Sequence, residues 1–219
     1  MAFKKLTEKR ATSRTPQVLT LIVDDSGSMK ANNKATQATE AMVNLVTTMQ
    51  SSNLGASQTR FYLNIAKFGT EVTPMAESAH PKDIPLTTLT FNGDSGETEI
   101  AKALDWAAQA TEKTISYCRT SVTDYNESET PRPLVVFFTD GGNTGRVISQ
   151  STQTLKSISF SGGHVDIVAV GIGLEPKNVP VLEQIASEPD LSVNIDPSKL
   201  ATFIVDVGVN LFHESWLRC

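Results

Sequence analysis

Two stretches of the sequence place carboxylates and hydroxyls directly after apolar runs. The first, "LTLIVDDSGSMK", covers Leu19–Lys30 and breaks off at Asp24, after which Ser26 and Ser28 follow at every second position. The second, "LVVFFTDGGN", runs into Asp140 and two glycines. A carboxylate at the end of a buried strand is costly unless a cation or hydrogen-bond donors satisfy it. Both strand ends are therefore candidate sites for cation binding.

A third stretch, "SGETEI", supplies a hydroxyl ahead of a predicted helix. Thr98 is expected to cap that helix, and Glu97 adds a carboxylate beside it. The three loops together predict one set of oxygen donors: Asp24, Ser26, Ser28, Thr98 and Asp140. Oxygen donors without Cys or His favour Mg²⁺, Mn²⁺ or Ca²⁺ over zinc or copper, and a nearly octahedral site that keeps some water suits Mg²⁺ best.

Strand-like and helix-like segments alternate along the chain. We expect strands over 18–25, 60–70, 134–143, 164–173 and 191–195, with a short edge hairpin at 71–75, and helices over about 31–52, 99–118, 146–158, 179–189 and 197–216. This order predicts a doubly wound α/β fold, in which helices flank a mainly parallel central sheet of about six strands. Ligands of such folds bind at the carboxyl ends of the strands, where the three loops converge.

Length and charge narrow the class of protein. The chain has 219 residues and a formal net charge of -5, which fits one main domain and disfavours nucleic acid as a partner. We expect a flexible arm over 1–15, the domain over 16–213 and a tail over 214–219. No apolar stretch approaches the roughly 20 residues of a membrane span, and no secretory signal is visible. These features predict a cytoplasmic protein in which Cys118 and Cys219 are free thiols.

Three motifs resemble those of von Willebrand factor type A domains. "DDSGSM" resembles the D-x-S-x-S motif of that family, "GETEIAKAL" its threonine segment and "FFTDGG" its second-aspartate segment, and the similarity extends over about 16–212. The resemblance implies a metal-ion-dependent adhesion site. There Ser26, Ser28 and Thr98 would hold the ion, and Asp24 and Asp140 would contact it directly or through water. A carboxylate from a protein partner would fill the remaining position.

Within that family the chain most resembles compact cytoplasmic bacterial proteins, including those linked to tellurium resistance and to kinase–phosphatase signalling. It departs from many relatives at "SGETE", where they carry a second glycine before the threonine. Glu97 therefore adds a carboxylate that either competes with the partner's acid or strengthens cation affinity.

Several alternatives remain open at this stage. Asp24, Ser26 and Ser28 alone also fit a polar turn that caps a helix, and alternation points Asp25 away from them, toward solvent or a hydrogen-bonded neighbour. A Mg²⁺-dependent phosphatase or hydrolase could use the same aspartates, although the loops lack a general base. Nucleotide binding is disfavoured because no phosphate-cradling glycine motif is present. We therefore expect a non-enzymatic, metal-dependent protein-binding module.

The acidic loop around Asp124, Glu127 and Glu129 is interpreted as a solvated insertion or a docking surface.

Overall fold

A six-stranded sheet forms the centre of the protein in a computed structural model that describes residues 9, 11–51 and 61–204. Its strands are β1 (Gln17–Asp24), β2 (Phe61–Phe68), β3 (Val72–Ala79), β4 (Leu134–Thr139), β7 (Asp166–Ile172) and β8 (Ser192–Ile195). They lie in the order β3-β2-β1-β4-β7-β8. All neighbouring pairs are parallel except β2 and β3. The predicted α/β fold with a mainly parallel sheet of six strands is confirmed.

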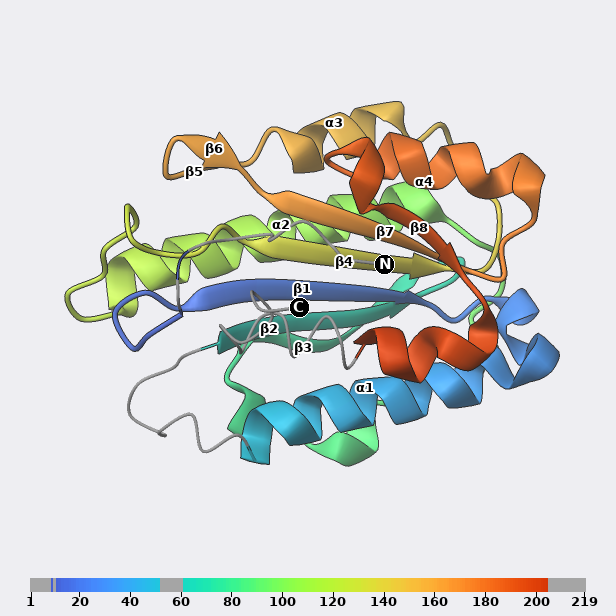
Figure 1. The fold of residues 1–219 in the computed structure, drawn as a ribbon, viewed down its shortest axis with the longest axis horizontal. Helices are drawn as coiled ribbons and strands as arrows, with labels where there is room; N and C mark the ends of the chain where they lie inside the picture. The colour runs from blue at the N-terminus through green and yellow to red at the C-terminus, as the bar shows by residue number, and fades with distance from the viewer. Residues whose placement is uncertain (1–8, 10, 52–60, 205–219) are drawn as a thin grey trace, which may run out of the picture.

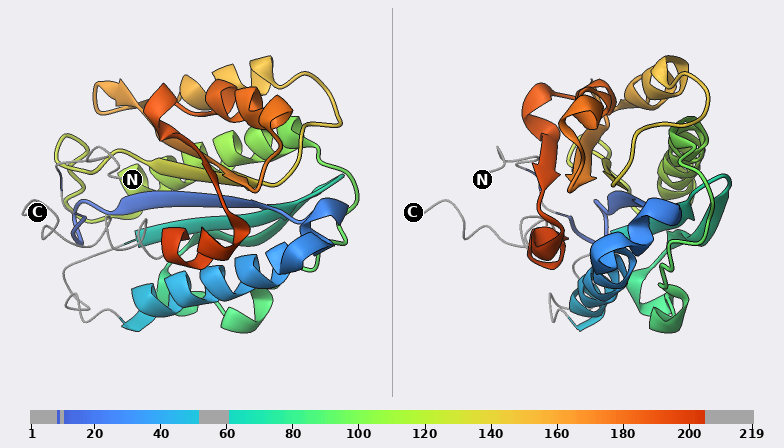
Figure 2. Two further views of the ribbon diagram at one scale, coloured as in Figure 1. Left: turned by 45° about the vertical axis from the view of Figure 1, so that its right-hand side comes forward. Right: turned by 90° about the vertical axis from the view of Figure 1, so that its right-hand side faces the viewer.

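Helices cover both faces of the sheet (Figures 1 and 2). They are α1 (Lys34–Ser51), α2 (Ile100–Ser121), α3 (Ser149–Lys156) and α4 (Val179–Ile185), and a small hairpin pairs β5 (Ser159–Phe160) with β6 (Gly163–His164). The views place α2, α3 and α4 on one face, and α1 with the helical residues 197–204 on the other. The last predicted helix is described only to residue 204, so its remainder, the tail 214–219 and Cys219 lie outside the described residues.

The sheet is buried on both faces because helices cover it from both sides. Every residue of β1 and of β4 is buried, as expected for central parallel strands. On α2, the side chains of Ala103, Leu104 and Ala107 are fully buried in the hydrophobic core. Burial of one leucine side chain stabilises a fold by roughly 1.5–3 kcal/mol. None of the described helices is both long and apolar enough to cross a membrane.

Hydrogen bonds are present in two regions that the sequence analysis interpreted as a flexible arm and as a solvated insertion or docking surface. In the predicted arm, the Thr12 and Thr15 hydroxyls lie 2.7 Å apart, and the Arg14 carbonyl accepts a hydrogen bond from Asn126. In the acidic loop, the Glu127 carboxylate accepts two hydrogen bonds from Arg119 at 2.6 and 2.9 Å. The acidic loop is therefore anchored rather than freely solvated at this position. Residues 1–8 and 10 of the arm lie outside the described residues.

Asp25 is a buried carboxylate that ties the loop before α2 to the end of β1. Its Oδ1 accepts hydrogen bonds from the backbone N–H groups of Asn92 and Gly93 at 2.7 and 2.6 Å. Its Oδ2 accepts one from the Ser95 hydroxyl at 2.8 Å and lies 3.0 Å from Lys67 Nζ. Of the two positions expected for Asp25, it takes the hydrogen-bonded one, with no exposed surface. Four donors therefore saturate this carboxylate and fix the loop.

Replacement of Asp25 should destabilise the protein strongly. Asp25→Ala leaves Lys67 and two backbone N–H groups unpaired in a buried region, which costs about 3–5 kcal/mol in the free energy of unfolding. Asp94 is an exposed aspartate of the same loop, so Asp94→Ala should cost less than about 0.5 kcal/mol. Urea denaturation of both variants in EDTA measures the difference. Equal losses would show that the Asp25 contacts do not stabilise the fold.

At the opposite end of the sheet, Asp166 begins β7 as a second buried carboxylate. Its side chain is only 8% exposed and lies 3.1 Å from an Arg132 guanidinium nitrogen. Burial raises the pKa of Asp166 to about 6; the Arg132 charge opposes this shift and the Glu188 charge adds to it. The folded protein therefore keeps a proton on Asp166 in a pH range where the unfolded chain, with a pKa near 3.8, has lost it.

This difference predicts a pH dependence of stability. Between about pH 4 and pH 6 the folded state binds more protons at Asp166 than the unfolded state, so this group lowers the free energy of unfolding as the pH rises. The Asp166→Asn variant should therefore show a smaller decrease in the free energy of unfolding between about pH 4 and pH 6. Glu183→Gln, which removes an exposed carboxylate of α4, should leave the curve unchanged. Denaturation curves at half-unit pH steps make the comparison, and an unchanged slope in Asp166→Asn would contradict it.

Candidate metal centre

Asp24 lies at the carboxyl end of β1 with no exposed surface. Its Oδ1 accepts a hydrogen bond from the Ser26 backbone N–H at 2.8 Å, and its Oδ2 accepts one from the Thr139 hydroxyl at 2.7 Å. Burial raises the pKa of Asp24 to about 6; the hydrogen bonds from Ser26 and Thr139 oppose this shift, and the nearby Asp140 adds to it. Two neutral donors thus leave the charge of this carboxylate only partly compensated, and a cation would relieve the cost.

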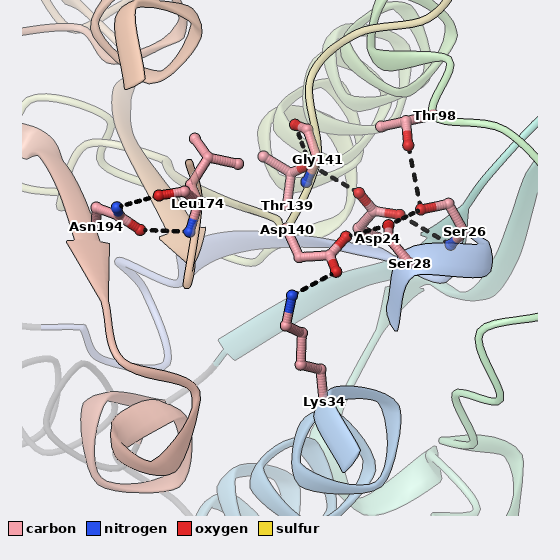
Figure 3. A network of polar contacts seen from close by, with 10 residues as sticks. All are labelled: Asp24, Ser26, Ser28, Lys34, Thr98, Thr139, Asp140, Gly141, Leu174 and Asn194. Atoms are coloured by element: carbon pink, nitrogen blue, oxygen red, sulfur yellow. Dashed lines mark hydrogen bonds and ion pairs between the residues drawn. The ribbon is translucent and has the colours of Figure 1, made fainter. Parts of the chain in front are cut away.

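All five residues predicted as ligands belong to one hydrogen-bonded network (Figure 3). The Thr98 hydroxyl donates to Ser26 Oγ at 3.1 Å, and the Ser26 and Ser28 hydroxyl oxygens lie 3.1 Å apart. The Ser28 hydroxyl donates to Asp140 Oδ1 at 2.6 Å. Asp24 joins the network through its bond with Ser26. Ser28 is exposed and the other four residues are buried, so the network opens to solvent on the side of Ser28.

Glycines keep this opening free of side chains. A Cβ atom on Gly141 would lie 3.3 Å from Thr98 Oγ1 and 3.7 Å from Ser28 Oγ, and would therefore enter the space beside these hydroxyls. The backbone of Gly27 donates to the Gly96 carbonyl at 2.9 Å, which joins the first loop to the second. The hydroxyls thus face a space bordered by backbone.

The prediction that Thr98 caps α2 is wrong. The helix α2 begins at Ile100, so Glu99 and not Thr98 precedes it directly. The Glu99 side chain forms no capping hydrogen bond. The Ile100 N–H donates instead to Asn143 Oδ1 at 3.2 Å, so a side chain of the loop after β4 supplies the cap. Thr144 of the same loop binds the Thr98 backbone, accepting from its N–H at 3.1 Å. The Thr98 hydroxyl is thereby left free to face Ser26.

Lys34 belongs to the same site but was not predicted. Its Nζ lies 2.8 Å from Asp140 Oδ2, and the two side chains are 10% and 0% exposed. Figure 3 shows this side chain reaching from the start of α1 toward the network. Glu97, by contrast, is exposed, and the network described above does not include its carboxylate.

Sequence reasoning missed the residues that support the ligands rather than the ligands themselves. Thr139, Asn143 and Thr144 lie in "TDGGNTG", where they read as ordinary turn residues. The sequence carries no signal for Lys34, because the helix expected from the sequence begins at about residue 31 and only the structure places this lysine at the first position of α1.

The set of donors fits a hard divalent cation. It offers two carboxylates and three hydroxyls. Hydrogen bonds link the three hydroxyls and the Asp140 carboxylate in one chain, and the Asp24 carboxylate joins them through the Ser26 backbone N–H. Within the described residues, no group of three or more His, Cys, Asp or Glu side chains could hold a metal ion. Metal binding at this place would thus depend on the hydroxyls, and oxygen donors favour Mg²⁺, Mn²⁺ or Ca²⁺.

Known proteins with the same fold come from several sources. A proximal thread matrix protein from the mussel byssus, solved with a zinc-occupied MIDAS motif, is 18% identical with a TM-score of 0.62; the alignment covers 92% of this chain and 49% of that one. The pilus adhesin SpaC from Lactobacillus rhamnosus GG is 14% identical with a TM-score of 0.71, over 93% of this chain and 31% of that one. A von Willebrand factor type A protein from Catenulispora acidiphila is 15% identical with a TM-score of 0.63, over 90% and 43%.

These similarities establish the fold, and the chain spans less than half the length of each of these structures. No curated protein matches the sequence. The sequence profile of one family matches residues 19–206, which include all of the sheet except the first two residues of β1, and all five residues of the network. The chain therefore belongs to the von Willebrand factor type A domain family.

Proposed function

We propose that this domain binds a protein partner through a divalent cation held by Asp24, Ser26, Ser28, Thr98 and Asp140. The observation that carries the proposal is the single hydrogen-bonded network that joins these residues from three separate loops and opens to solvent at Ser28. Mg²⁺ is the proposed ion, and Mn²⁺ or Ca²⁺ would suit the same donors. An Asp or Glu of the partner would complete the coordination.

The donor types support binding of an acidic group. Three of the five proposed ligands are neutral hydroxyls, which do not cancel the charge of a divalent ion. When bound, the cation would supply an electrophilic position at the open end of the network. The zinc-occupied MIDAS motif of the mussel byssus protein and the adhesive role of SpaC are consistent with this type of site.

We propose that the site is not enzymatic. A phosphatase that used Asp24 as its nucleophile would need an accessible carboxylate oxygen, but Asp24 is 0% exposed and both of its oxygens accept hydrogen bonds. The Lys34 ammonium is engaged by Asp140 and so is not free to act as a base. These contacts favour a binding role over the alternative of a Mg²⁺-dependent phosphatase or hydrolase.

The proposal extends to the setting of the protein. A cytoplasmic domain with a net charge of -5 and an exposed, electrophilic metal position is suited to scaffold or regulate a complex. We propose a bacterial signalling or stress-response complex, such as those associated with tellurium resistance, on the sequence motifs described above.

Metal binding should be weakened or lost when ligand side chains of the network are removed. Calorimetric titration of Mg²⁺ and Mn²⁺ into the EDTA-stripped protein should show one site, and Ser28→Ala should weaken it by about tenfold or more while leaving the fold intact, because Ser28 is exposed. An Asp24→Ala, Ser26→Ala double variant should abolish binding. Asp94→Ala removes an exposed carboxylate outside the network and should bind as the wild type does. Undiminished binding in both network variants would place the metal elsewhere.

Partner binding should depend on the same site. A protein captured from a bacterial lysate by the Mg²⁺-loaded domain should be released by EDTA and should not be captured by the Ser28→Ala variant. Capture that resists EDTA would show that the partner binds another surface. Turnover of a phosphate ester such as p-nitrophenyl phosphate that disappears in Asp24→Ala would favour the phosphatase alternative instead.

A further inference from the structure

Lys34 carries a positive charge at a buried position where positive charge is unfavourable. It is the first residue of the 18-residue helix α1, where the helix dipole is positive, and only 8% of the residue is exposed. A buried ammonium at that end of a helix is destabilising unless a carboxylate compensates it. Asn32 and Asn33, with φ of 55° and 56°, adopt the left-handed conformation immediately before it. The local chain thus accepts two unfavourable features to bring this lysine to its place.

Asp140 is the group that compensates Lys34, and it also belongs to the metal centre. Its Oδ2 lies 2.8 Å from Lys34 Nζ, while its Oδ1 accepts the hydrogen bond of the Ser28 hydroxyl at 2.6 Å. One carboxylate is therefore shared between a fixed ammonium and the hydroxyls that would hold the cation (Figure 3).

A second buried pair at the same end of the sheet provides a comparison. Lys67 Nζ lies 3.0 Å from Asp25 Oδ2, and the side chains are 19% and 0% exposed. Asp25 also accepts hydrogen bonds from two backbone N–H groups and a serine hydroxyl, none of which belongs to the metal centre. The two lysines are thus alike in burial and pairing, but only Lys34 binds a proposed metal ligand.

We propose that Lys34 is a tethered counter-charge of the metal centre, which competes with the cation for Asp140 and keeps the filled centre positively charged. This inference rests on the proposed function. With a divalent cation, two carboxylates and one ammonium, the filled centre carries a formal charge of +1, whereas without Lys34 it would be neutral. Lys34 therefore weakens metal affinity and, in exchange, strengthens the attraction of the filled centre for an anionic ligand such as a carboxylate. Before metal binds, Lys34 stabilises the buried Asp140.

The test uses charge-removing variants with a matched control. Lys34→Gln and Lys34→Met remove the ammonium, and the amide of the first can still donate a hydrogen bond to Asp140. Lys34→Arg keeps the charge. Lys67→Gln removes the other buried lysine, and Asp25 retains three donors in that variant. Calorimetric titration of Mn²⁺ into each EDTA-stripped protein measures affinity, and thermal unfolding with and without Mn²⁺ measures the gain in stability on binding.

We expect Lys34→Gln and Lys34→Met to bind Mn²⁺ about tenfold more tightly than the wild type, because a like charge has left the site. Lys34→Arg and Lys67→Gln should stay within about threefold of the wild type. Without metal, both neutral Lys34 variants should unfold at lower temperature, and Mn²⁺ should raise their Tm by more than it raises that of the wild type. A merely structural role of Lys34 would lower Mn²⁺ affinity instead.

The outcomes separate this inference from the function on which it rests. If the wild type binds Mn²⁺ but the neutral Lys34 variants bind equally or more weakly, the counter-charge role is wrong and the metal-dependent function stands. An equal gain in Mn²⁺ affinity in Lys67→Gln would also overturn the counter-charge role. Removal of any positive charge near this edge of the sheet would then have the same effect. If the wild type binds no Mn²⁺, both the proposed function and this inference fail.

Acetate serves as a probe for the anionic ligand. By linkage, an anion that binds the filled centre raises the apparent affinity for Mn²⁺, so acetate should strengthen Mn²⁺ binding to the wild type more than to Lys34→Gln. The ratio between the two proteins cancels the weak binding of Mn²⁺ to acetate itself. Equal enhancement in both proteins would show that Lys34 does not promote binding of the anion.

Discussion

The structure around the candidate centre depends on the cost of burying carboxylates at the ends of β1 and β4. Asp24 is 0% exposed and the Asp140 side chain is 0% exposed, so neither can rely on water for its hydrogen bonds. Each instead receives donors that a different part of the chain supplies: Thr139 and the Ser26 backbone for the first, Ser28 and Lys34 for the second. The need to satisfy these two groups therefore determines which loops must meet at this edge of the sheet.

The same loops are fixed to one another by contacts outside the ligand set. Asp25 holds the loop before α2 by two backbone N–H groups, and that loop continues to Thr98. Thr144 binds the Thr98 backbone from the loop after β4, and the Gly27 N–H joins the first loop to the second. These bonds lie outside the proposed ligand set, so the loops that carry the hydroxyls are held to one another by contacts of their own. Such contacts restrict the loops and lower the entropic cost of ordering the ligands around a cation.

The sequence predicts the parts of this arrangement that follow from local pattern. Alternation of Asp24, Ser26 and Ser28 after a buried strand indicates that their side chains face one side, and parallel strands bring Asp140 to the same edge. The role of Lys34 could not be predicted, since it depends on where α1 begins and on the left-handed Asn32 that precedes it. Similarly, the cap of α2 comes from a loop more than forty residues away in the chain rather than from the adjacent threonine, and propensity rules describe only neighbours in sequence.

The balance of charge at this edge explains why adjacent aspartates serve different purposes. Lys67 compensates Asp25 and Lys34 compensates Asp140, so Asp24 is the carboxylate of the three whose contacts are only with neutral donors. Burial makes the negative charge of Asp24 costly and raises its pKa to about 6, and the neutral donors offset this cost only in part. The negative charge of Asp24 is the one that no lysine balances among these three aspartates. A divalent cation would neutralise it and leave the centre with a net charge of +1. The surplus then favours an anionic ligand at the open side of the network. The Lys34–Asp140 pair therefore weakens the affinity for metal and strengthens the attraction for a partner's carboxylate.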